Sequence, residues 1–253
     1  LYGYQAYPEL EITNNLVQSS SSSNNPYGLY GYYTGAGSKV IGNNFELHGN
    51  NYTYGVLMYY GQGTASQPIE INNNIINSTN PNGSYSQYGL RVGYGYHYKV
   101  YHNTMKISNN YGSSYGLYAY LTYSGQGNEI KNNIVYTPST TPYTVYTYGA
   151  GTYCDFENNA YYAGGSNEIR LYSAQNGTYS TLTAWQAASS SDVGSVAEDP
   201  LFSSANDLTP GSTNLNNICD PEGITTDIYG YTRSTTTPDP GAIEFSVPTN
   251  NAQ

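Results

Sequence analysis

The chain has 253 residues, of which 9% are charged, and its formal net charge is −10. Because 7 Lys and Arg stand against 17 Asp and Glu, with no basic stripe, nucleic acid is not an expected partner and an anionic polysaccharide is disfavoured. No run approaches the roughly 20 apolar residues that would span a bilayer. A surface built largely from Asn, Ser, Thr, Gly and Tyr favours an extracellular or cell-surface protein.

The dipeptide Asn-Asn returns along the chain at a nearly constant interval. Successive copies of its second residue are 29, 30, 29, 30 and 26 residues apart, with His102-Asn103 filling one gap, at Asn15, Asn44, Asn74, Asn103, Asn133 and Asn159. A period of this length indicates a solenoid in which each repeat is one coil. Stacked coils would place these side chains about 4.8 Å apart. We therefore predict a hydrogen-bonded amide ladder at a bend between two strands.

Short strands flank each Asn pair. The residue three positions before the second Asn is apolar in every copy, namely Ile12, Ile41, Ile71, Val100, Ile130 and Phe156. The residue one position after it is mostly apolar as well: Leu16, Phe45, Ile75, Thr104, Ile134 and Ala160. Because a strand alternates its side chains between two faces, we predict that both columns point inward.

A further strand is marked by Tyr-Gly followed by an apolar residue, in Tyr27-Gly28-Leu29, Tyr54-Gly55-Val56, Tyr88-Gly89-Leu90, Tyr115-Gly116-Leu117 and Tyr148-Gly149-Ala150. No stretch of the body has helical spacing. The sequence therefore predicts an all-β parallel β-helix of about six coils over residues 1–178. Residues 179–253 are predicted to form a short helix and an irregular C-terminal cap within the same domain. The N-terminal Leu1-Tyr2-Gly3-Tyr4 resembles the start of a Tyr-Gly strand, which predicts that the chain begins inside a coil.

The C-terminal third carries a family resemblance. The short segment Leu182-Thr183-Ala184-Trp185-Gln186 is followed by four further motifs: Asp199-Pro200-Leu201-Phe202, Leu208-Thr209-Pro210-Gly211-Ser212, Asp227-Ile228-Tyr229-Gly230 with Arg233, and Pro240-Gly241-Ala242-Ile243-Glu244-Phe245. Together with the coils they resemble a secreted right-handed parallel β-helix of the pectin-lyase-like kind, with the closing segment of the bacterial proteins. The resemblance implies a fold more than a function, because this solenoid hosts lyases, hydrolases, adhesins and structural proteins.

Tyrosine is the most unusual component, with 33 copies. On the Tyr-Gly strands, with the apolar residue inward, an outward stripe is predicted at Tyr30, Tyr59, Arg91, Tyr118 and Tyr120. Three interpretations remain open for it. Stacked rings can hold the coils in register, the stripe can contact a subunit or another surface, or it can bind sugar rings.

Charged residues are arranged across coils. The column four positions before the second Asn holds Glu11, Val40, Glu70, Lys99, Glu129 and Asp155. Two positions before the second Asn, Lys131 and Glu157 are neighbours on successive coils. Both sets are explained as cross-coil ion pairs. Glu129 with Asp155 is a weak candidate for a metal or catalytic site. No cofactor is indicated, Ca²⁺ included, and His48, His97 and His102 lack metal-ligand spacing.

Two cysteines and four sequons complete the candidate sites. Given an extracellular setting, Cys154 and Cys219 are predicted to form a disulfide between coils and cap, with two separate buried thiols as the alternative. The sequence Asn-x-Ser/Thr marks four glycosylation candidates, at Asn51, Asn77, Asn82 and Asn176.

These features favour an extracellular, non-catalytic β-solenoid that acts as a structural or adhesive surface protein. Its expected partners are its own subunits, stacked head to tail into a filament through an uncovered coil end, or a surface polysaccharide. The alternatives are a polysaccharide lyase or glycoside hydrolase of the pectin-lyase-like group, and a glycan-binding module.

Overall fold

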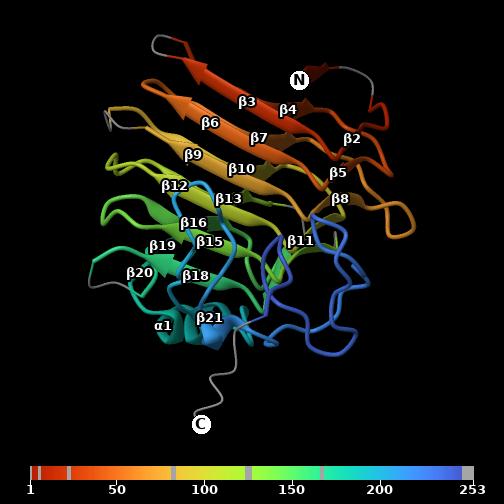
Figure 1. The fold of residues 1–253 in the computed structure, drawn as a ribbon. Helices are drawn as coiled ribbons and strands as arrows, with labels where there is room; N and C mark the ends of the chain where they lie inside the picture. Colours follow the sequence, from red (N-terminus) through yellow and green to blue (C-terminus); the bar gives the residue numbers. More distant parts are fainter. Residues whose placement is uncertain are drawn as a thin grey trace.

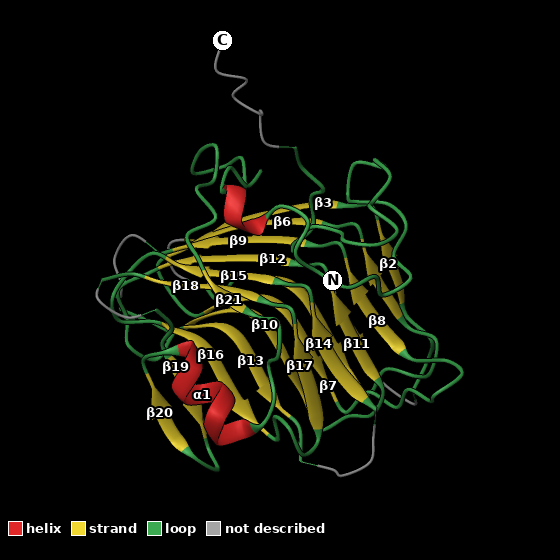
Figure 2. Ribbon diagram, turned by 90° about the horizontal axis from the view of Figure 1, so that it is seen from below, coloured by secondary structure: helices red, strands yellow, loops and turns green. Residues whose placement is uncertain are grey.

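A computed structural model describes residues 2–4, 7–21, 24–80, 84–122, 127–165 and 168–246. In it the chain winds into a parallel β-helix of about five turns, so the predicted fold is confirmed with about one turn fewer than predicted. Each turn adds one strand to each of three sheets (Figure 1). Seen along the axis, the sheets are three walls around a common core (Figure 2).

Within the described residues the three sheets have eight, six and seven strands, in the following spatial orders. Sheet A contains β1 (Tyr2–Tyr4), β4 (Tyr27–Tyr32), β7 (Thr53–Tyr59), β10 (Gln87–Gly93), β13 (Tyr115–Tyr120), β16 (Tyr143–Tyr148), β19 (Leu171–Ser173) and β20 (Gly177–Tyr179). Sheet B contains β17 (Cys154–Glu157), β14 (Asn128–Lys131), β11 (Tyr98–Tyr101), β8 (Ile69–Asn72), β5 (Lys39–Ile41) and β2 (Glu11–Thr13). Sheet C contains β21 (Val196–Ala197), β18 (Ala160–Ala163), β15 (Ile134–Thr137), β12 (Thr104–Ser108), β9 (Ile75–Thr79), β6 (Asn44–Gly49) and β3 (Leu16–Ser21).

The core is made of apolar columns that run along the inside of the three walls. On sheet A the column is Leu29, Val56, Leu90, Leu117, Val145 and Leu171, all fully buried. The first four are the apolar residues of the Tyr-Gly motif, as predicted. The glycine of that motif is required by the close approach of the next coil, because a Cβ at Gly55 would collide with the carbonyl oxygen of Gly89. The fifth pair, Tyr148-Gly149, ends β16, and the inward residue of that coil is Val145.

The predicted amide ladder is present at the bend between sheets B and C. Each side-chain Nδ2 donates to the Oδ1 of the next coil at 2.9 to 3.0 Å, through Asn15, Asn43, Asn74, Asn103, Asn133 and Asn159. Each acceptor also receives the backbone N–H of the previous ladder residue, at 2.9 to 3.0 Å. The side chain of one coil thus satisfies two donors of its neighbour, and all members beyond Asn15 are fully buried.

The second coil corrects the predicted ladder by one residue. Asn43, and not Asn44, points inward, because Gly42 takes the left-handed bend conformation (φ 69°) that Asn14 and Asn73 take in their coils. Asn44 instead begins β6 on the outside of the wall. The inward residue before the bend is accordingly Val40 rather than Ile41, and Lys39 rather than Val40 occupies the outward charged column.

In the apolar column predicted to follow the ladder residue, Phe45 points inward as predicted, because the one-residue shift of the second coil aligns it with Ile76. The other members, Leu16, Ile75, Thr104, Ile134 and Ala160, point outward. In sheet C the core is formed by Phe45 and by the residues after these outward ones, among them Ile76 and Met105. The outward residues Ile75, Ile134 and Ala160 are buried nevertheless, because the closing segment, residues 198–246, packs over them with Leu208, Ala242, Ile243 and Leu215. Leu16, on the first coil, is 62% exposed. Two apolar residues in succession therefore belong to two different packing layers.

The residue directly before each ladder residue binds the closing segment. In the covered coils it lies at positive φ, where it projects outward: Asn73, His102, Asn132 and Asn158. The Asn73 amide donates to Thr226 O at 2.7 Å and accepts from the buried Arg233 guanidinium at 2.9 Å. Asn132 donates to Asp220 O at 2.8 Å. At each of these bends, one residue therefore points inward and joins the ladder, and the residue before it points outward and binds the closing segment.

The C-terminal end of the solenoid is covered by helix α1 (Leu182–Ser189), below the last coils in Figure 1. Its Trp185 is fully buried and donates from Nε1 to the buried carboxylate of Asp192 at 3.0 Å. Asp192 also accepts from the Tyr161 hydroxyl at 2.9 Å and receives the last ladder amide, Asn159, at 3.4 Å. The ladder thus ends on a buried carboxylate that is fully supplied with donors.

We predict that Asn103→Ala destabilises the fold by about 2 to 4 kcal/mol, because it leaves the buried Asn74 donors without their acceptor and opens a cavity. Chemical denaturation would measure the free energy of unfolding. Asn15→Ala is the matched control, since Asn15 is exposed at the start of the same ladder, and its loss should cost less than about 1 kcal/mol. Equal losses for both variants would contradict the ladder's role.

The His102 ring predicts acid sensitivity of the docked segment. Burial, and then the charge of Arg233, lower its pKa to about 3. Its two ring nitrogens lie 3.1 Å from Asp239 O and from the Asn132 amide nitrogen, which fits a neutral ring that donates to one and accepts from the other. Because the folded pKa lies below the ordinary 6.5, this contribution to stability is complete above pH 6.5 and is lost as pH falls towards 3.

At pH 4.5 the loss should be about 2 to 3 kcal/mol. The matched variant is His102→Asn, which restores the residue that other coils carry at this bend and cannot titrate. Thermal unfolding between pH 4.5 and 7 should show a smaller pH dependence for His102→Asn than for the unchanged protein. Identical pH dependence in the two proteins would rule out His102 as the cause.

Candidate functional site

The outer face of sheet A carries three registered columns, which we call the tyrosine face. The first column is Tyr27, Tyr54, Tyr88, Tyr115 and Tyr143. The second is Tyr30, Leu57, Arg91, Tyr118, Tyr146 and Tyr172. The third is Tyr32, Tyr59, Gly93, Tyr120 and Tyr148. The five residues predicted from the sequence lie together in the second and third columns, where each is half-buried.

The first column was missed by sequence reasoning. Tyr27 lies two residues before the inward Leu29, so strict alternation would place it inside. It begins the strand and is instead 38% exposed, and its ring stacks on that of Tyr54. The recurrence of tyrosine before glycine was the signal that could have identified this column.

Rings within a column are stacked face to face. The centroid distances are 4.7 Å for Tyr27–Tyr54, 5.0 Å for Tyr54–Tyr88 and 4.5 Å for Tyr118–Tyr146, with interplanar angles of 6°, 2° and 2°. The first and second columns meet edge to face, as in Tyr115–Tyr118 at 82°, whereas rings of the second and third columns lie close to parallel, as in Tyr118–Tyr120 at 19°. Because ring faces are engaged with one another, the surface presents mainly ring edges and hydroxyls.

Arg91 lies in the middle of the tyrosine face. Its guanidinium carbon is 4.7 Å from the ring centroids of Tyr88 and Tyr118 and 5.0 Å from that of Tyr59, and its Nε donates to the Tyr59 hydroxyl. Although burial lowers the pKa of Arg91, these neighbouring hydroxyls raise it overall. The cation is therefore held among three rings, where each contact contributes about 0.5 to 2 kcal/mol.

The phenols of this surface are neutral at pH 7, and burial raises the pKa values of several of them further above the ordinary 10. Burial, followed by the neighbouring Tyr88 and Tyr27, raises the pKa of Tyr54 to about 12. Burial likewise raises the pKa values of Tyr88, Tyr115 and Tyr146. These hydroxyls remain protonated at neutral pH and can both donate and accept hydrogen bonds.

Sheet B carries the cross-coil ion pairs on its outer face. Lys99 pairs in register with Glu70 and Glu129, as predicted, and the corrected column alternates in sign from Glu11 through Lys39 to Glu129 before it ends at Asp155. Lys99 contacts Glu129 directly. Lys131 lies 2.8 Å from Glu157, 3.5 Å from Glu222 and 3.7 Å from Glu129.

These ion pairs occupy part of the candidate metal site formed by Glu129 and Asp155. Although burial raises the pKa of Glu129, hydrogen bonds from Lys99 and Tyr101 lower it overall. Its carboxylate therefore has an ammonium and a hydroxyl where a cation would have to bind, while Asp155 is exposed on the next strand. Across the described ranges no group of three or more His, Cys, Asp or Glu is placed to hold a metal ion.

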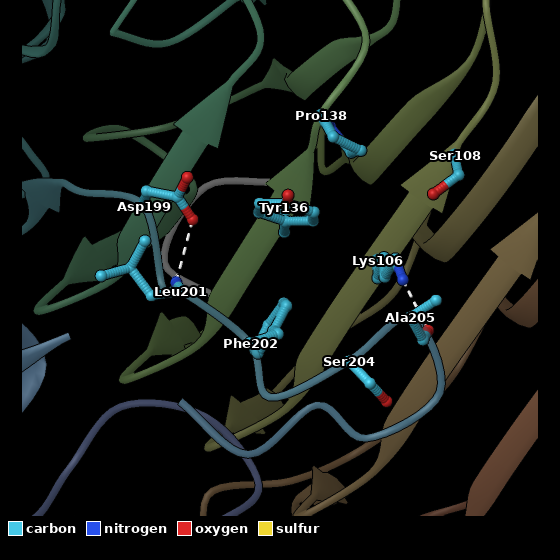
Figure 3. A pocket seen from close by; sticks show the side chains of 9 residues that line it. All are labelled: Lys106, Ser108, Tyr136, Pro138, Asp199, Leu201, Phe202, Ser204 and Ala205. Atoms are coloured by element: carbon cyan, nitrogen blue, oxygen red, sulfur yellow. Dashed lines mark hydrogen bonds between the residues drawn. The ribbon is translucent and has the colours of Figure 1, made fainter. Parts of the chain in front are cut away.

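A groove lies on the outside of sheet C, where the closing segment crosses β12 and β15 (Figure 3). It has a volume of about 510 Å³ and is lined by Lys106, Ser108, Tyr136, Pro138, Asp199, Leu201, Phe202, Ser204 and Ala205. Lys106 Nζ donates to Ala205 O at 2.6 Å, and burial lowers its pKa. Asp199 is the single carboxylate in this lining. A hydrolase would need two carboxylates across the bond that it cleaves.

The predicted disulfide is not formed, because its two cysteines are free and belong to different layers. Cys154 points into the core from β17. Cys219 belongs to the closing segment and approaches the Asn158 carbonyl from outside, with Sγ 3.4 Å from the oxygen. The alternative of two separate buried thiols describes this arrangement.

The sequons differ in accessibility. Asn176 is exposed and Asn51 is half-buried, whereas Asn82 lies outside the described residues. Asn77 is 3% exposed, and its Nδ2 donates to Ala205 O at 3.1 Å beneath the closing segment. An oligosaccharide transferase could therefore reach Asn77 only before the closing segment docks.

Comparison with protein families, curated proteins and solved structures found no match. The α-helix of the described residues is eight residues long, and no helix there has the length and apolarity to cross a membrane.

We predict that millimolar Ca²⁺ leaves the thermal unfolding midpoint unchanged, because Lys99 and Lys131 already neutralise Glu129. Differential scanning fluorimetry with Ca²⁺ and with a chelator measures this. Lys99→Met, which removes the nearest cation from Glu129 and leaves Lys131 and Tyr101 in place, is the informative comparison. A rise of the midpoint with Ca²⁺ in the unchanged protein would restore the metal-site hypothesis.

Proposed function

We propose that this chain is a non-catalytic β-solenoid of the cell exterior that acts as a structural or adhesive protein, with the tyrosine face as its contact surface. The observation that carries the proposal is the registered array of half-buried tyrosines along one flat wall. Tyrosine offers a large contact area at low cost in conformational entropy, together with a polar tip. Such a surface suits a broad, uncharged and ordered partner.

The ring orientation supports a particular mode of contact. Because the ring faces are stacked on one another, a sugar ring cannot lie flat on most of them, and hydroxyl-mediated contact is favoured over ring stacking. Another subunit or a polysaccharide surface can both supply matching hydrogen-bond groups. The contact surface is thus a periodic set of hydroxyls at the coil spacing.

Assembly through this wall is better supported than head-to-tail stacking. Helix α1 and the antiparallel strand β20 lie over the C-terminal end, so a coil edge from another subunit would have to displace them. Both the lateral and the end-to-end forms of assembly remain parts of the proposal, and electron microscopy distinguishes them by the shape of the particles.

Glycan binding is the second candidate function, and the groove on sheet C favours it. Tyr136 and Phe202 offer apolar contact there, and Ser108, Ser204 and Asp199 offer hydrogen-bonding groups. Loss of polysaccharide binding on Tyr136→Ala, with binding retained by variants of the tyrosine face, would favour the groove. Release of unsaturated or reducing products from a polysaccharide would overturn the non-catalytic proposal.

The main proposal predicts that a triple variant, Tyr30→Thr, Tyr118→Thr and Tyr120→Thr, loses adhesion while staying folded, because Thr retains strand propensity. The double variant Tyr229→Thr and Tyr231→Thr is the control, since these closing-segment rings are 62% and 68% exposed. Sedimentation velocity would measure self-association, and pull-down with insoluble polysaccharides would measure adhesion.

The triple variant should bind at least about tenfold more weakly, which corresponds to about 1.4 kcal/mol. The control should bind like the unchanged protein. Circular dichroism would verify folding of both variants. Equal binding by a folded triple variant would contradict the role of the tyrosine face.

A further inference from the structure

We propose that the tyrosine face is a site of oxidative modification, at which a peroxidase-type one-electron oxidant joins tyrosines of successive coils through dityrosine bonds. The proposal does not depend on which partner the face contacts. It rests on the distribution of oxidisable side chains, on the stacking of the rings, and on the chemistry of phenoxyl radicals.

Oxidation at the surface is directed to tyrosine by the burial of every competing side chain. Trp185, Met58 and Met105 are fully buried, and Cys154 and Cys219 are 3% and 1% exposed. In contrast, Tyr27 is 38% exposed and the remaining rings of the first column are half-buried. A macromolecular oxidant or a small diffusing radical therefore meets phenols before any other oxidisable side chain, both on this wall and at the more exposed Tyr229 and Tyr231.

The stacked pairs have the geometry that coupling requires. The unpaired electron of a phenoxyl radical occupies the π system, with density on the carbons ortho to oxygen, so a new carbon–carbon bond begins to form along the normal to the ring. Tyr118 and Tyr146 face each other at 4.5 Å and 2°, and Tyr27 and Tyr54 at 4.7 Å and 6°. The strand ladder holds both pairs in register.

The reaction balances with hydrogen peroxide as the terminal oxidant. Each of two tyrosines gives one electron and one proton and becomes a phenoxyl radical. The two radicals combine through their ortho carbons, and each of these carbons passes its hydrogen to its own oxygen as the rings regain aromaticity. One hydrogen peroxide takes up the two electrons and two protons and becomes two molecules of water.

Such bonds would fasten one coil to the next. A solenoid is stabilised mainly by contacts between neighbouring repeats, so a covalent bond across that interface opposes the separation of coils. Because the tyrosines recur on several successive coils, several bonds can form on one molecule. Sheet A would then become covalently cross-linked and more stable after folding, which suits a structural protein.

The test treats the intact protein, at several dilutions, with a heme peroxidase and hydrogen peroxide. We expect the blue fluorescence of dityrosine, a loss of two hydrogen masses per bond in a molecule that stays monomeric, and a yield independent of protein concentration. Peptide mapping should locate bonds at Tyr118–Tyr146 and Tyr27–Tyr54. The thermal unfolding midpoint should rise after treatment.

Tyr118→Phe is the informative variant, because it retains the stacked ring and removes the hydroxyl that forms the radical. It should lose the bond to Tyr146 and retain the bond between Tyr27 and Tyr54. Tyr229→Phe is the matched control and should leave both bonds unchanged, although Tyr229 is the more exposed ring.

Three results would overturn the proposal. One is the absence of dityrosine under conditions in which a tyrosine peptide is coupled. Another is dityrosine that forms only between molecules, with a yield that rises with concentration. The third is coupling confined to Tyr229 and Tyr231, which would show that exposure and not stacking directs the reaction.

Discussion

The register between coils depends on a short hydrogen-bonded unit at the bend from sheet B to sheet C. Each inward Asn accepts two donors from the preceding coil, one from the side chain and one from the backbone. Each such bond contributes only about 0.5 to 1.5 kcal/mol, but a buried donor left unpaired costs about 1 to 3 kcal/mol. A coil that slipped by one residue would therefore bury several unpaired groups at once, so the ladder selects one register.

The same bend determines how the closing segment is attached. With its second residue turned inward, the first must take a left-handed conformation and point outward, where Asn73, His102, Asn132 and Asn158 meet the segment. The segment then covers the apolar outer residues of sheet C. Inner register and outer docking are consequences of one backbone geometry, repeated in each coil.

The three sheets share one apolar core, but their outer faces differ in what they carry. Sheet C is covered by the closing segment, sheet B carries cross-coil ion pairs, and sheet A exposes the tyrosine face. The spacing that aligns the amides inside also brings the tyrosines into stacking distance outside. The ladder thus sets the coil register of sheet A and the alignment of its tyrosines, although no ladder residue belongs to that sheet.

The repeat length, the parallel β-helix, the ladder and the pairing of Lys99 with Glu129 follow from the sequence by itself, because residues one coil apart become neighbours. The sequence could not show that Gly42 takes the left-handed position of the second bend, since glycine and Asn both adopt that conformation. The predicted ladder therefore contained Asn44 where the structure has Asn43. The sequence also could not separate the inner apolar layer from the outer one, because both read as hydrophobic. Only the tertiary structure decided that Cys154 and Cys219 lie in different layers and that the first tyrosine column faces outward. Those outcomes depend on packing between segments distant in sequence, whereas the repeat depends on one local pattern.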